Sequence, residues 1–119
     1  MLISVKFAEI SAFSSIFIFI SWFTAPGEVD IVGIDIAKQK AEWAVEVKWS
    51  DRYFNKPAEL KSLLYFMENN HMERALVTSL TKRGVKQLRT VSLEFIPSAI
   101  YAYTVGYDRF KAFLTSQNL

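Results

Sequence analysis

The sequence predicts a single mixed α/β domain, and two observations carry this prediction. Apolar residues alternate with polar ones along some stretches and repeat with a helical period along another. The 119 residues include 14 basic and 12 acidic side chains and are 51% hydrophobic, which is a globular balance. The chain has no Cys, so disulfide frameworks, thiolate zinc sites and cysteine nucleophiles are all excluded.

The first predicted unit is a hairpin that begins directly after Pro26 and Gly27. Val and Ile are frequent at residues 28–36, and residues 41–49 alternate between apolar and polar, so we expect two antiparallel strands joined by polar residues. In the second strand this alternation directs Val47 into the core. Further along we expect a helix at 57–70, strands at 74–80 and 91–97, and a short helix at 98–103. If the strands on either side of the helix at 57–70 are parallel, that crossover is right-handed.

The first 25 residues carry only two charges and contain an uncharged run at 10–25 that is rich in Phe and Ile. As a helix this run would be about 24 Å long, shorter than a hydrocarbon core of about 30 Å. Three interpretations stay open: a buried core segment, a membrane or signal segment, and a non-native leader from a truncated reading frame. We therefore expect a hydrophobic leader at 1–26, a folded domain at 27–106 and a C-terminal tail at 107–119.

Several kinds of site are not supported by any motif. The chain has neither a P-loop nor a G-x-G-x-x-G segment after a strand. Its one histidine, His71, lies at the end of a predicted helix, where a solvated cap is the ordinary role. A Ser-His-Asp triad would need this histidine, so that class is not expected.

One set of charged residues on the predicted hairpin has usable geometry. Glu46 and Lys48 share a face of the second strand, and pairing Ile36 with Lys40 would place Asp30 opposite Glu46, with Cβ atoms about 5 Å apart. A four-residue loop would instead need a β-bulge to keep Asp30 on that face. Paired carboxylates suit Mg²⁺, and a nearby ammonium can hold a water or a phosphate oxygen, as in metal-assisted phosphodiester hydrolysis. The alternative is a satisfied charge cluster on a half-buried sheet.

The acid-x-Lys pattern by itself is not specific. It recurs at Glu59 and Lys61, in the predicted helix. On a helix these two side chains point about 200° apart and cannot share a cation. Only the copy on the strand has the geometry of a site.

Several segments resemble the C-terminal domain of a large group of prokaryotic AAA+ ATPases. The matching segments are EVDIV (28–32), WAVEVKWSDRYF (43–54), PAELKSL (57–63), RALVT (74–78) and FIPSA (95–99), and the likeness runs from Gly27 to about Gly106. That domain has no assigned function and is similar to the PD-(D/E)XK restriction-endonuclease-like fold. The resemblance implies a restriction-endonuclease-like mixed sheet flanked by helices, incomplete at the N-terminus and detached from its ATPase module.

The same resemblance implies roles for individual residues. Asp30 and Glu46 would bind magnesium, with the backbone carbonyl of Val47 as a further ligand, and Lys48 would assist the water. Glu9 would stand where a helix carboxylate often joins such sites.

A basic cluster suggests DNA as the substrate. Four cations fall within eight residues that contain no acid: Lys82, Arg83, Lys86 and Arg89. On a loop around Gly84 they would contact phosphates; the alternative is a solvated basic loop. Tyr53 and Phe54 could stack on bases, although aromatic residues just before a helix, like Tyr101 and Tyr103 near the C-terminus, are expected in the core.

Three functions follow from these observations. The first is a magnesium-dependent, cytoplasmic nuclease-fold domain that binds DNA. The second is a non-catalytic interaction domain left from an ATPase tail, which docks onto an ATPase module or another protein. The third is a small membrane-associated protein anchored by residues 10–25.

Overall fold

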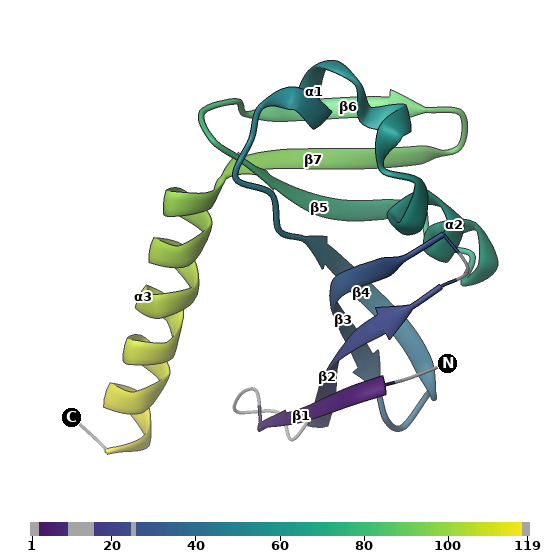
Figure 1. The fold of residues 1–119 in the computed structure, drawn as a ribbon. Helices are drawn as coiled ribbons and strands as arrows, with labels where there is room; N and C mark the ends of the chain where they lie inside the picture. Colours follow the sequence, from purple (N-terminus) through teal and green to yellow (C-terminus); the bar gives the residue numbers. More distant parts are fainter. Residues whose placement is uncertain (1–2, 10–15, 25, 118–119) are drawn as a thin grey trace.

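The computed structural model describes residues 3–9, 16–24 and 26–117, which fold around a seven-stranded mixed sheet of order β1-β2-β3-β4-β5-β7-β6 (Figure 1). The strands are β1 (Ile3–Glu9), β2 (Ile16–Phe23), β3 (Glu28–Asp35), β4 (Lys40–Glu46), β5 (Arg74–Ser79), β6 (Gly84–Leu88) and β7 (Val91–Pro97). The helices are α1 (Arg52–Asn55), the 3₁₀ helix η1 (Pro57–Glu59), α2 (Lys61–Asn69) and α3 (Ser98–Ser116). The predicted α/β class, with a mixed sheet flanked by helices, is confirmed.

The sheet changes from antiparallel to parallel pairing at β4. Strands β1 to β4 form an antiparallel meander, β4 pairs in parallel with β5, and β5 pairs in parallel with β7. A parallel pair needs a crossover connection, which α1, η1 and α2 supply between β4 and β5. As a result the C-terminal ends of β4, β5 and β7 lie at one end of the sheet, together with the beginning of β3.

Three of the seven strands were not predicted: β1 and β2 in the leader, and β6. Residues 84–88, expected as a loop, form β6 and pair antiparallel with β7 at the edge of the sheet. Short edge strands commonly carry lysine, which protects the open edge from aggregation. Lys86 in the middle of β6 is such an edge lysine, and in the sequence it was interpreted as part of a basic loop.

The described part of the leader belongs to the sheet. Residues 16–23 form β2, which pairs with β3, and residues 3–9 form β1, which pairs with β2. Of the proposed anchor at 10–25, residues 10–15 and 25 lie outside the described residues. In the part of the chain that the structure describes, no helix is both long and apolar enough to cross a membrane.

The core lies between the sheet and the helices of the crossover. The buried apolar side chains come from β3, β4, β5, β7 and α2 and include Val29, Val32, Ala44, Leu63, Phe66, Met67, Val77, Leu93 and Phe95. Full burial of such a side chain stabilises the fold by about 1.5–3 kcal/mol. Tyr53 and Phe54 also pack against this core, and Phe54 meets Phe95 edge to face at 5.3 Å between ring centroids. The interpretation of these two aromatics as core residues is confirmed.

Helix α3 is much longer than predicted. It continues past Tyr103 and through Gly106 to Ser116, so residues 107–116 of the expected tail at 107–119 are helical. A glycine costs an exposed helix only about 1 kcal/mol and does not end it. Figure 1 shows α3 leaving the sheet, and none of its residues is buried. Tyr103 is 73% exposed, so its predicted place in the core is wrong.

Candidate functional site

The register of the hairpin brings Asp30 and Glu46 together. The hairpin starts with Asp35 paired to Lys40 around a four-residue loop, instead of the predicted pairing of Ile36 with Lys40. A register shift follows, in which Glu42 has no partner on β3. Beyond this bulge Ile31 pairs with Val45, and the same register continued by one residue places Asp30 opposite Glu46. The four-residue loop thus requires a bulge, and the structure contains it.

A second irregularity lies at Asp30 itself. Between the pairs Ile20–Val32 and Trp22–Val29, one residue of β2, Ser21, opposes two residues of β3. The Ser21 hydroxyl donates a hydrogen bond to the Asp30 carbonyl at 3.0 Å. β-Bulges are over-represented next to active sites, where they redirect a side chain. Here the Asp30 carboxylate reaches across to β4 and its Oδ2 accepts the Val47 N–H at 2.8 Å.

Glu46 is a buried acid next to the Asp30 carboxylate. It is only 3% exposed, at the end of β4. Burial, then the hydrogen bond with Asp30, then repulsion from the Asp30 carboxylate raise the pKa of Glu46 to about 8, while the charge of Lys48 acts in the opposite direction. Desolvation and a like charge both disfavour the ionised form. At neutral pH Glu46 therefore keeps its proton.

Lys48 is held through its backbone. The Thr78 hydroxyl accepts the Lys48 N–H at 2.7 Å and donates to the Lys48 carbonyl at 2.9 Å. The Ser98 hydroxyl, at the start of α3, lies 3.0 Å from the same carbonyl oxygen. The ammonium of Lys48 lies 5.1 Å from the centroid of the Tyr53 ring, a cation–π distance. Contacts from β5, α3 and α1 thus hold Lys48 beside Asp30 and Glu46, which we call the acidic pair.

The predicted inward orientation of Val47 is wrong. Its side chain is 47% exposed, whereas Ala44 and Glu46 are buried. β4 ends at Glu46, so strand alternation does not extend to Val47, whose N–H donates to the Asp30 carboxylate instead of a backbone carbonyl of a neighbouring strand. The role of the Val47 carbonyl as a metal ligand stays a prediction.

Asp30 and Glu46 offer two carboxylates as possible metal ligands. Among the described residues no group of three or more His, Cys, Asp and Glu side chains could hold a metal ion. Mg²⁺ keeps several waters and is usually bound through one or two carboxylates, which Asp30 and Glu46 can supply once Glu46 loses its proton. Zinc sites need three or four protein ligands, and this pair does not offer them.

Glu9 does not join the acidic pair. It ends strand β1, where a helix carboxylate was expected, and pairs with Ile16. The next residue of β2, Phe17, pairs with Asp35. Glu9 therefore lies at the opposite end of β3 from Asp30.

The four basic residues are spread along an edge of the sheet. Lys82 and Arg83 precede β6 and lie at the same end of the sheet as Lys48, whereas Arg89 follows β6 at the other end. Between them, the Lys86 ammonium lies 4.2 Å from the centroid of the Phe54 ring. Of the four, Lys82 and Arg83 therefore lie at the same end of the sheet as the acidic pair.

Asp51, which holds the loop before β6, was not identified from the sequence. Its carboxylate accepts the backbone N–H groups of Leu80, Thr81 and Lys82 at 2.8–3.1 Å and the Thr81 hydroxyl at 2.6 Å. These hydrogen bonds, that of the Thr81 hydroxyl first, lower the pKa of Asp51. The loop that follows Lys48 is thereby tied to the loop that carries Lys82. An acid two residues after a predicted strand was the one signal in the sequence.

No family model, curated protein or solved structure matches this chain. The likeness to the ATPase tail therefore depends on the motifs between Gly27 and Gly106 alone.

Proposed function

We propose that this chain is a PD-(D/E)XK-like nuclease domain that binds DNA in the cytoplasm and hydrolyses its phosphodiester bonds with magnesium. The observation that carries the proposal is the position of the buried Glu46 next to Asp30, two strand carboxylates that the register brings together beside Lys48, where burial and then Asp30 raise the pKa of Glu46. A charge cluster that served stability alone would pair each acid with a cation. Here acid meets acid, and Glu46 keeps its proton.

Each residue has a distinct role in this proposal. Asp30 and Glu46 hold the cation, and Glu46 releases its proton when it does so. A bound Mg²⁺ would polarise the phosphoryl group and lower the pKa of a water. Lys48, held by Thr78 and Ser98, orients that water or a phosphate oxygen. Lys82 and Arg83 at the same end of the sheet contact the DNA backbone, so binding weakens as salt rises.

The direct test is cleavage of supercoiled plasmid with Mg²⁺ or Mn²⁺. We expect cleavage that disappears in Lys48→Ala and in Asp30→Asn. Lys61→Ala is the matched control, because Lys61 belongs to the second acid-x-Lys pattern but begins α2 and is exposed. Folded protein that binds no cation and leaves DNA intact would overturn the proposal.

A second candidate function has its own supporting observation. Helix α3 has no buried residue and exposes Tyr103, Tyr107, Phe110 and Phe113. We therefore also propose that the chain can act as an interaction domain whose partner, an ATPase module or another protein, covers this helix. A pull-down whose yield falls in Phe110→Ser but not in Lys48→Ala would favour this function over hydrolysis.

A further inference from the structure

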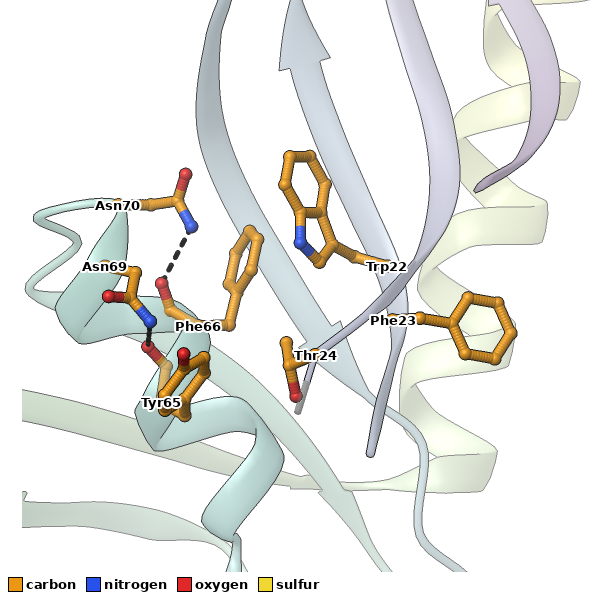
Figure 2. Close-up of a pocket in the computed structure, with 7 residues that line it drawn as sticks. All are labelled: Trp22, Phe23, Thr24, Tyr65, Phe66, Asn69 and Asn70. Carbon is orange, nitrogen blue, oxygen red and sulfur yellow. Dashed lines mark hydrogen bonds between the residues drawn. The ribbon is translucent and has the colours of Figure 1, made fainter. Parts of the chain in front are cut away.

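A cavity between the end of β2 and α2 is not used by the proposed function. Its volume is about 350 Å³ and it lies between two aromatic-bearing elements (Figure 2). It is lined by Trp22, Phe23, Thr24, Tyr65, Phe66, Asn69 and Asn70. None of these residues is charged, so the cavity suits a neutral ligand.

The apolar surface of the cavity consists of aromatic rings from both elements. Trp22 of β2 meets Phe66 of α2 edge to face, with ring centroids 5.2 Å apart and an angle of 62° between the planes. Tyr65, next to Phe66 on α2, is 44% exposed and presents its ring to solvent at the rim. Figure 2 shows the Trp22 ring on the α2 side of β2 and the Phe23 ring on the other side. A flat ring entering the cavity would therefore contact Trp22, Phe66 and Tyr65.

Polar groups of the cavity belong to Trp22 on β2 and to Asn69 and Asn70 at the end of α2. The side-chain amides of Asn69 and Asn70 donate to the carbonyls of Tyr65 and Phe66 at 3.0 and 2.9 Å. These bonds fix the two side chains one turn beyond the aromatic pair. Among the described residues, neither Asn Oδ1 has a hydrogen-bond donor and the Trp22 indole N–H has no acceptor. Figure 2 shows the indole nitrogen on the side of the ring that faces α2. The Trp22 indole N–H and the Asn69 and Asn70 amide oxygens are therefore left for a hydrogen bond with solvent or a ligand.

We propose that this cavity binds an unpaired nucleobase. A base is neutral, presents a flat π-face to aromatic side chains, and has donors and acceptors side by side on its edge. Adenine, whose N7 accepts and whose N6 donates, matches an indole N–H and an asparagine oxygen. Because a nucleoside carries no phosphate and this cavity no charge, binding needs neither the cation nor Lys48.

The cavity lies at the same end of the sheet as the acidic pair. Trp22 pairs with Val29, the residue before Asp30, and Ser21 binds the Asp30 carbonyl. A base held in the cavity would therefore come from a single strand that passes close to Asp30. The basic residues Lys82 and Arg83 lie beyond the acidic pair, on the loop before β6.

The test is a titration with adenosine in the absence of divalent cations, followed by ¹H–¹⁵N spectra. We expect saturable shifts of the Trp22 indole N–H and of the Asn69 and Asn70 side-chain amides. Tyr65→Ala, at an exposed position that leaves the core intact, should weaken binding at least about fivefold, the lower end of what base stacking contributes. Asn69→Ala should weaken it in the same direction. Tyr103→Ala removes a more exposed tyrosine, from α3, and should change nothing.

Two results would overturn the inference. One is the absence of saturable shifts at millimolar adenosine in protein whose remaining spectrum is unchanged. The other is an equal response to methyl glucoside, which would identify a sugar site instead of a base site. Because adenosine has no scissile phosphodiester, failure of the nuclease proposal would leave this result untouched, and the reverse also holds.

Discussion

Thr78 holds both polar groups of the Lys48 backbone with a single hydroxyl, at 2.7 Å from its nitrogen and 2.9 Å from its carbonyl oxygen. Thr78 is 1% exposed and belongs to β5, whose pairing with β4 ends at Glu46 and Val77. Where the backbone ladder stops, the side chain of Thr78 replaces it. The position of Lys48 beside the acidic pair therefore depends on a buried hydroxyl.

Thr78→Val should destabilise the protein by about 1–3 kcal/mol, because the isosteric side chain leaves the Lys48 N–H without its acceptor and the Lys48 carbonyl with the Ser98 hydroxyl alone. Urea unfolding measures the change. Thr78→Ser keeps the hydroxyl and should recover most of the loss. If the valine and serine variants were equally stable, the hydroxyl would have no part in holding Lys48.

Asp51→Ala should loosen the loop before β6, because the carboxylate accepts three consecutive backbone N–H groups there. Hydrogen exchange of the Leu80, Thr81 and Lys82 amides should accelerate. Asp108→Ala serves as control, since Asp108 lies in exposed α3. The pKa of Asp51 is lowered in the folded protein, so its stabilisation is present above the unfolded pKa and is lost as pH falls through the folded pKa. Unchanged hydrogen exchange of these amides would show that the loop is ordered without the Asp51 carboxylate.

Gly33→Ala should cost about 1–3 kcal/mol, because a Cβ at Gly33 would overlap the indole ring of Trp43 on the neighbouring strand. Gly106→Ala is the matched control: nothing lies within 4 Å of a Cβ there, and α3 should gain up to about 1 kcal/mol. Thermal unfolding of both variants compares them. If Gly33→Ala left the stability unchanged, the Trp43 ring would not be packed against the backbone of Gly33.

Glu46 should make stability depend on pH. Its pKa is raised from 4.5 to about 8 in the folded protein, so between these values the folded state binds more protons than the unfolded state. Stability should therefore fall as pH rises through this window, by up to about 1.4 kcal/mol per pH unit. Urea unfolding at a series of pH values should show this slope, and Glu46→Gln should flatten it. Glu94→Gln, on exposed β7 surface, should not. A wild-type profile without the slope would mean that Glu46 ionises freely.

The local periodicities predicted much of the fold. The strand at 28–35, the stripe of α2 and the strand at 91–97 were all visible in the spacing of apolar residues, because each buries one side against the core. The leader was ambiguous because a strand such as β2 and a short apolar helix have similar composition. Helix α3 was underestimated because it buries nothing, and burial is what makes a helix recognisable.

The site was predicted only as far as strand geometry allows. Asp30 and Glu46 share a face, but they meet through two bulges that no alternation pattern reveals. Thr78, Ser98 and Asp51 act through hydrogen bonds to backbone groups far away in sequence. Such contacts depend on how β4, β5 and α3 converge, and a single sequence does not contain that information.

The central claim is that Asp30 and Glu46 together hold a divalent cation. Calorimetric titration of Mg²⁺ at pH 7, repeated in buffers with different ionisation enthalpies, counts the protons released for each cation bound. With a Glu46 pKa of about 8, we expect close to one proton for each Mg²⁺, and no binding in Asp30→Asn. Magnesium binding that releases no proton, or that survives in Asp30→Asn, would contradict the account.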